Sequence, residues 1–236
     1  RGAGLGSSIP DEEYVAEGAR ILDTADEVWA TADLLLKVKE PVAEEYHRLR
    51  KDQTLFTYLH LAASKECTDA LIESGTTAIA YETVELPSRA LPLLAPMSEV
   101  AGRLAPQVGA YHLMRSVGGR GVLPGGVPGT QPARAVVIGG GVSGWNATQI
   151  AVGMGFHVTL LDRDINKLRE ADKVFGTKVR AIMSNAFELE KAVLDADLVI
   201  GAVLIPGAKA PKLVTNELVS RMKPGSVLVD IAIDQG

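Results

Sequence analysis

The sequence predicts an α/β protein of two domains, each built on a parallel sheet. From Asp33 onward, short apolar runs alternate with helical stretches, which is the pattern of strands joined by crossover helices. In the second half, runs such as 135–138 and 197–203 are almost continuously apolar, as strands buried on both faces of a sheet must be. The length of 236 residues, 47% of them hydrophobic, exceeds one usual domain. We therefore expect a smaller α/β domain followed by a doubly wound parallel sheet.

The first domain is expected to span residues 1–130. Strands are predicted at 33–39, 54–60 and 76–84. The polar stretch between the first two strands, 41–53, is interpreted as a helix or a turn. Ser64 is a good N-cap and Gly75 a good C-terminal signal, so a helix is predicted between them.

A helix and a loop are predicted to join the two domains. Apolar residues recur at helical spacing at positions 100, 104, 108 and 111. Pro106 interrupts this stripe, so the connecting helix is expected to be kinked. Glycine and proline then dominate 116–133, a composition typical of a loop between domains. The boundary is placed near Thr130.

The second domain, 131–236, is predicted to be a regular series of alternating strands and helices. Its strands are expected at 135–138, 157–162, 178–183, 197–203 and 226–232. Its helices are expected at about 143–154, 165–175, 186–194 and 215–222. Five strands in this order predict a doubly wound parallel sheet of the dinucleotide-binding, or Rossmann, type.

Composition excludes several classes of protein. The net charge of −5 gives no electrostatic basis for binding nucleic acid or an anionic membrane. No apolar run approaches the roughly 20 residues of a membrane span. A single cysteine, Cys67, excludes a disulfide framework and a multi-cysteine metal site, and its apolar neighbours indicate a thiol in the core. We expect a cytoplasmic protein without a metal, acting on small molecules.

A glycine-rich loop is the clearest functional motif. Gly139, Gly141 and Gly144 follow an apolar strand and open a helix, and Asp162 ends the next strand. This is the dinucleotide-binding arrangement, with roles for the three glycines in a tight turn, close approach of pyrophosphate, and helix–strand packing. A carboxylate at Asp162 accepts hydrogen bonds from ribose hydroxyls but repels a 2′-phosphate, so NAD is favoured over NADP. Arg163, the next residue, leaves NADP open.

The candidates for proton transfer are histidines. His60 ends a predicted strand and precedes a loop of small residues, but its position alone leaves catalytic and structural roles equally open. We interpret His47 and His112 as solvated or packed, and His157, which opens a strand, as structural.

Charged residues at strand ends complete the set of candidates. Lys39 ends the first strand and shares a strand face with Lys37 by alternation, although a lysine there is more often a surface residue. Asp234 closes the last strand at the carboxyl edge, where doubly wound sheets bind their ligands. Asp230, inside the same strand, is either functional or a structural carboxylate.

Several separated motifs, in order, resemble one family. They are "LLLKVKEP", "TLFTYLHLA", "PLLAPMSEVAGRLA", "GVPG", "VVIGGGVSGWNA", "DLVIGAVLIPGAKAPKLV" and "VLVDIAIDQG". Together they resemble the alanine dehydrogenase and transhydrogenase alpha-subunit family, and in particular the bacterial L-alanine dehydrogenases, over essentially the whole chain. The transhydrogenase subunit looks dissimilar around "TYLHLA" and "LAPMSEVAG".

The resemblance implies reversible NAD-linked deamination of L-alanine to pyruvate and ammonium, in a homohexamer. It assigns His60 and Asp234 to catalysis and Lys39 to substrate binding. The cofactor contacts it implies, together with those of the glycine loop, are Ser98, Gly139, Gly141, Val142, Gly144, Asp162, Lys167, Ser184, Val203, Leu204, Ile231, Ala232, Ile233 and Asp234. The alternative is a catalytically idle NAD(H)-binding module like the transhydrogenase subunit.

The resemblance also implies parts that this sequence does not contain. Family members begin with a segment carrying an arginine that binds the substrate carboxylate, and they end with a long segment that completes both domains. We therefore expect the chain to be truncated at both ends.

Overall fold

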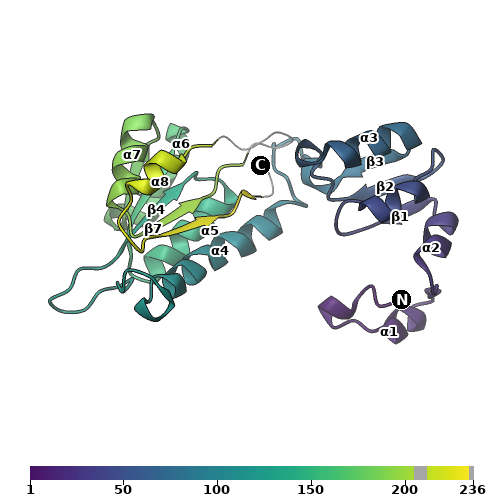
Figure 1. The fold of residues 1–236 in the computed structure, drawn as a ribbon, viewed down its shortest axis with the longest axis horizontal. Coiled ribbons are helices and arrows are strands. Elements are labelled where there is room, and N and C mark those ends of the chain that lie inside the picture. The colour runs from purple at the N-terminus through teal and green to yellow at the C-terminus, as the bar shows by residue number, and fades with distance from the viewer. Residues whose placement is uncertain (205–211, 234–236) are drawn as a thin grey trace. The chain divides into compact units, whose positions relative to one another are not determined.

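The computed structural model describes residues 1–204 and 212–233, and it forms two compact units (Figure 1). The units are Arg1–Glu82 and Thr83–Gly236, so they divide earlier in the chain than the boundary predicted near Thr130. The long helix α4 (Ala95–His112) belongs to the second unit because it packs closely against helix α5 (Val142–Gly153). A functional boundary near Thr130 stays a prediction.

The first unit contains a three-stranded parallel sheet in the order β1-β2-β3. Its strands are β1 (Leu34–Leu36), β2 (Thr54–Thr57) and β3 (Thr77–Ala80), shorter than the predicted runs but in the predicted places. One face carries the core, in which Leu35 and Leu55 pack with Trp29 of helix α2 (Ala25–Thr31) and with Leu71 of helix α3 (Lys65–Ser74). The expected α/β unit is confirmed.

The signals at the ends of α3 act as predicted. The Ser64 side chain accepts a hydrogen bond from the Cys67 N–H (3.2 Å), and Gly75 ends the helix at φ +67°. The polar stretch after β1 contains a 3-10 helix, Ala43–Arg48. Two helices before Asp33 had no prediction, α1 (Asp11–Ala16) and α2. A capping box formed by Thr24 and Glu27 begins α2, and its sequence signal, a threonine three residues before a glutamate, was available.

The second unit is the predicted doubly wound sheet, with five parallel strands in the order β6-β5-β4-β7-β8. The strands are β4 (Arg134–Ile138), β5 (His157–Asp162), β6 (Val179–Met183), β7 (Leu198–Gly201) and β8 (Val227–Asp230). The strand order reverses between β4 and β7, because the chain moves outward on one side through β5 and β6 and then returns. The carboxyl ends of β4 and β7 therefore flank the switch point at which such sheets bind ligands.

Helices cover both faces of this sheet, and alternate strand residues supply the two cores. Ala135 and Val137 face the layer that contains α4, α5 and α6 (Ile165–Phe175). Val136 and Ile138 face the layer of α7 (Ala186–Asp195) and α8 (Asn216–Ser220). Figure 1 shows α4 and α5 on one side of β4 and β7, with α7 and α8 on the other. Burial on both faces explains the continuous apolar runs.

Helix α4 packs by its small residues, and its apolar stripe does not make this contact. The stripe residues are exposed within the described part of the chain: Val100, Leu104, Val108 and Tyr111. The buried face consists of Gly102, Ala105, Pro106 and Gly109. A Cβ on Gly102 would lie 2.2 Å from the backbone oxygen of Ser143 in α5, so only glycine allows this approach. The helix continues from Ala95 to His112 with Pro106 inside it.

Candidate functional site

The glycine loop joins β4 to α5 at the switch point. Gly139 has φ +101°, a conformation that other residues adopt only with strain. A Cβ on Gly144 would lie 1.7 Å from the backbone oxygen of Gly139, so the helix could not pack here with any side chain at that position. A Cβ on Gly141 would meet nothing within 4 Å. The three glycines thus serve a turn, a close contact and an open face, as the motif predicts.

Asp162 is held against this loop by backbone hydrogen bonds. Its Oδ2 accepts from the Gly140 N–H at 2.5 Å, and its Oδ1 accepts from the Asp164 N–H at 2.7 Å. The ammonium group of Lys167 lies 3.7 Å from Oδ2. The carboxylate is only 11% exposed, and its orientation is therefore fixed before any ligand arrives.

The other predicted cofactor residues of this unit lie mostly at the carboxyl edge of the sheet. Val203 lies beside Gly139, and Ser184 extends the sheet by donating its N–H to the backbone carbonyl oxygen of Asp162 at 2.8 Å. Ser98 is one helical turn before Gly102, on the part of α4 that packs against the start of α5. The remaining positions are Val142 at the start of α5, Leu204 after β7, and Ile231, Ala232 and Ile233 after β8. Asp234 lies outside the described residues.

These residues fit a dinucleotide. The N-terminus of α5 has no side-chain cap, so its first N–H groups are free of a competing side chain. The open space beside Gly141 adjoins that helix end, where pyrophosphate binds in this fold. Asp162 can accept further hydrogen bonds, since an ionised carboxylate offers about four acceptor sites. The loop could therefore hold pyrophosphate, and Asp162 a ribose.

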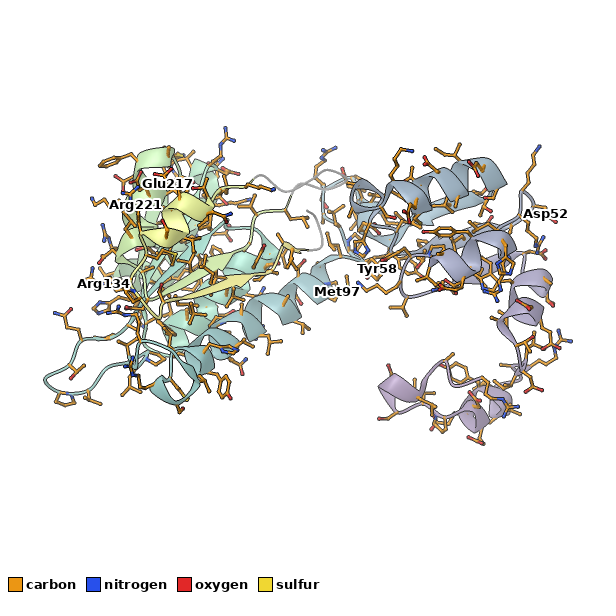
Figure 2. All side chains as sticks on the ribbon, viewed as in Figure 1. Asp52, Tyr58, Met97, Arg134, Glu217 and Arg221 are labelled. Carbon is orange, nitrogen blue, oxygen red and sulfur yellow. The ribbon has the colours of Figure 1, made fainter. Side chains whose placement is uncertain are left out.

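The first unit holds the predicted proton-transfer residue, His60. It follows β2 and Tyr58, which Figure 2 labels, and its side chain is 13% exposed. The imidazole Nδ1 lies 2.9 Å from Oε2 of Glu40. The His60 backbone is left-handed, at φ +48°, and its N–H donates to Oε1 of Glu82 at 2.8 Å. Among the described residues, none hydrogen-bonds to Nε2, so that nitrogen remains for a ligand.

Glu40 is a site residue that the sequence reasoning missed. Burial disfavours its charge, but the hydrogen bond from His60, a backbone hydrogen bond at Glu40 and the nearby charge of Lys39 outweigh burial and hold the pKa of Glu40 below its usual value. It is thus an ionised partner for the imidazole near neutral pH. Its place inside the "LLLKVKEP" motif was the available signal. Glu82, 22 residues beyond His60, left no signal of that kind.

Lys39 and Lys37 differ in their surroundings. β1 ends at Leu36, so the alternation expected to place both lysines on one strand face does not reach them. Lys37 pairs with Glu45 (Nζ to Oε2, 3.1 Å). Lys39 is exposed, and none of the residues described makes an ion pair with its ammonium group. Lys39 therefore has a free cation to offer a carboxylate.

Cys67 has the structural role expected of it, and Asp230, for which two roles were left open, has a structural partner. Cys67 is 1% exposed and burial raises the pKa of its thiol, so it is a core thiol. The Asp230 carboxylate accepts from the Ala232 N–H at 2.9 Å, which is a structural use. In the described part of the chain, no helix is both long and apolar enough to cross a membrane. The same residues contain no cluster of three or more His, Cys, Asp or Glu suited to a metal.

The strand order, the glycine loop and the carboxylate held beside it define a nucleotide-binding protein of the doubly wound class. Residues 105–236 match the C-terminal domain of the alanine dehydrogenase/PNT family, and residues 1–101 match its N-terminal domain. The chain belongs to this family.

Relatives with known structure or curated names support this assignment. The alanine dehydrogenase of Mycolicibacterium smegmatis is 68% identical over 235 residues, which cover 100% of this chain and 63% of the relative. A solved L-alanine dehydrogenase aligns with a TM-score of 0.87 at 52% identity, covering all of this chain and 65% of its own. A transhydrogenase from Sinorhizobium meliloti aligns with a TM-score of 0.78 at 31% identity, covering 100% and 68%. The chain thus spans 63% of the length of its curated relatives.

Proposed function

We propose that the protein catalyses the reversible NAD-linked oxidative deamination of L-alanine to pyruvate and ammonium. The observation that carries the proposal is the imidazole of His60, held at Nδ1 by Glu40 and open at Nε2, in the same unit as the unpaired cation of Lys39. A general acid/base and a carboxylate-binding cation are the two side chains that an amino-acid dehydrogenase requires on the substrate. The high identity to curated alanine dehydrogenases supports this substrate class.

Lys39 would bind the carboxylate of alanine or pyruvate through a charge-assisted hydrogen bond. A bound nicotinamide would supply the hydride acceptor for the α-carbon of alanine, after the alanine ammonium has given one proton to Asp234. Water then adds to the resulting iminium carbon, and Nε2 of His60 takes a proton from that water. The carbinolamine formed in this way collapses to pyruvate and ammonia as a proton moves from its hydroxyl to its amine. Ammonia then takes back the proton held by Asp234 and leaves as ammonium, and the proton on His60 is released to solvent. His60 returns its proton on the reverse path, and Asp234 is proposed to handle the protons of the amine.

The cofactor proposed is NAD. The α5 N-terminus beside Gly141 would hold the pyrophosphate, and Asp162 would accept from the ribose hydroxyls. The other contacts proposed for it are Ser98, Val142, Lys167, Ser184, Val203, Leu204 and 231–234. Asp162 favours NAD over NADP, because its fixed carboxylate would face a 2′-phosphate of like charge.

The test is oxidation of NADH by the intact protein in the presence of pyruvate and ammonium, followed by its absorbance. We expect turnover that requires both substrates, and reduction of NAD by L-alanine in the reverse direction. Omitting ammonium is the matched control, because it separates amination from simple reduction of the ketone. NADH binding without any turnover would overturn the proposal.

The second candidate is an idle NAD(H)-binding module of the transhydrogenase type, which the alignment to the Sinorhizobium meliloti structure favours. The same assay separates the two functions, because the module would bind NADH and leave pyruvate unchanged. We also propose that the protein assembles as a homohexamer, which sedimentation or light scattering of the intact protein would test.

A further inference from the structure

Two carboxylates contact His60: Glu40, which precedes it in the chain, and Glu82, which follows it. Glu40 follows β1, and Glu82 follows β3, the two strands that flank β2 in the sheet. His60 itself follows β2, so the three residues come from three adjacent strand ends. One carboxylate contacts the imidazole ring and the other contacts the backbone. We propose that Glu40 and Glu82 are the positioning residues of His60, the first fixing the ring and its tautomer and the second fixing the backbone that carries it.

The backbone of His60 needs a restraint. Its φ of +48° and ψ of +37° are left-handed, and a residue with a Cβ adopts this conformation only at a cost in free energy. The Glu82 carboxylate receives two successive N–H groups there, from Leu59 at 3.0 Å and from His60 at 2.8 Å, both on Oε1. These N–H groups lie beyond the end of β2 and would otherwise lack a sheet partner. Glu82 thus replaces the missing ladder bonds and holds the turn.

The ring is fixed by the chemistry of its partner. An ionised carboxylate only accepts hydrogen bonds, so the contact of 2.9 Å between Glu40 and Nδ1 requires a proton on Nδ1. The neutral imidazole is then left with its lone pair on Nε2, the nitrogen that faces no described partner. Glu40 is itself restrained, because Pro41 limits the residue before it to extended backbone. The arrangement follows the general rule by which a carboxylate orients a catalytic base.

The first test measures the tautomer directly and needs no activity. The ¹⁵N chemical shifts of the His60 ring, at a pH where the ring is neutral, distinguish a proton on Nδ1 from one on Nε2. We expect the Nδ1–H form in the intact protein. In Glu40→Gln we expect a mixture, because an amide can either donate to Nδ1 or accept from it. An Nε2–H tautomer in the unmodified protein would overturn the role of Glu40, whatever the protein catalyses.

The second test is kinetic and rests on the proposed function. Glu40→Gln should lower kcat by about 10- to 100-fold, as loss of an orienting partner commonly does, with KM for pyruvate and Kd for NADH changed less than about threefold. Glu45→Gln is the matched control, since Glu45 is also a partly buried glutamate of this unit, but its partner is the ammonium group of Lys37. Equal kcat in the Glu40 and Glu45 variants would refute positioning by Glu40. If the protein lacked dehydrogenase activity altogether, the proposed function would fail while the tautomer measurement still decided this one.

The role of Glu82 is tested by two substitutions that differ in hydrogen bonding. Glu82→Ala removes the acceptor, so amide hydrogen exchange at Leu59 and His60 should become at least about tenfold faster and kcat should fall. Glu82→Gln keeps one oxygen able to accept both N–H groups, and it should restore slow exchange and most of kcat. Unchanged exchange at these two amides in Glu82→Ala would contradict the proposal.

Discussion

The candidate sites of the two units differ in the groups that form them, backbone in one and side chains in the other. In the nucleotide-binding unit, backbone makes the site: three glycines shape the loop, and Asp162 is fixed by the N–H groups of Gly140 and Asp164. In the first unit, side chains make the site, because His60 is held by glutamates that lie 20 and 22 residues away in the chain. A site made of backbone leaves a compact motif in the sequence. A site formed by side chains that are distant in the chain leaves only single, widely separated residues in the sequence.

The largest effect is expected at His60, the single side chain that we propose for proton transfer. His60→Gln should lower kcat by ~10² to 10⁴-fold, the usual range for loss of a general acid/base, while NADH binds as before because the loop belongs to the other unit. Steady-state assays and a fluorescence titration with NADH measure the two quantities. His47→Gln is the matched control, since His47 is exposed in the same unit. Turnover within threefold of the unmodified protein would return His60 to a structural role.

The glycine loop of the nucleotide-binding unit should lose stability when a methyl group is added at its close contact. Gly144→Ala places a methyl group 1.7 Å from the Gly139 oxygen, so we expect the free energy of unfolding to fall by about 3 kcal/mol or more, with loss of NADH binding. Gly153→Ala, in the same helix, has nothing within 4 Å and should raise that free energy by about 0.5 kcal/mol. Urea denaturation measures both. Similar stabilities for the two variants would show that the close contact does not exist in solution.

The difference between local features and contacts that are distant in the chain also explains what could be predicted from the sequence. All five strands from β4 to β8 were predicted in the right places, because their apolar runs are local in the sequence. The inner strands β4 and β5 match to within a residue, whereas the predicted runs at 197–203 and 226–232 are longer than β7 and β8. The apolar stripe predicted helix α4 itself but does not mark its buried face, since Gly102 and Gly109 allow a closer contact than Leu104 or Val108 could make. A helix can therefore be buried along a face of small residues, and such a face leaves no hydrophobic periodicity in the sequence.

In the site, the glycines and Asp162 could be assigned from spacing alone, whereas His60 needed a family resemblance. Glu40 and Glu82 were missed because they meet His60 only through the pairing of β1 and β3 with β2. Strand order in a parallel sheet is a long-range property, and no local pattern specifies it. The boundary near Thr130 depended on glycine and proline content, which marks a loop but does not reveal that α4 packs on α5.

The smallest effect is expected at Asp162, because the side chain that we propose for ribose binding is also a hydrogen-bond partner of the loop backbone. Asp162→Ser removes the charge and also frees the N–H groups of Gly140 and Asp164, so affinity for both dinucleotides should fall. Only the ratio of the NADPH and NADH dissociation constants isolates the charge. We expect NADH to bind more tightly in the unmodified protein and the ratio to shrink by about tenfold, or about 1.4 kcal/mol, in the variant.

The matched control is Asp164→Ser, which alters a second carboxylate just after β5. Asp164 caps helix α6 by accepting from the Asn166 N–H at 2.8 Å, and serine can also cap. Its ratio of dissociation constants should stay as in the unmodified protein, although it removes the same charge two residues away. Fluorescence titration with both cofactors gives the two ratios. The contrary outcome is that Asp164→Ser lowers the ratio of the NADPH and NADH dissociation constants as much as Asp162→Ser does. The preference for NADH would then come from the total negative charge at this strand end, and not from the fixed carboxylate of Asp162.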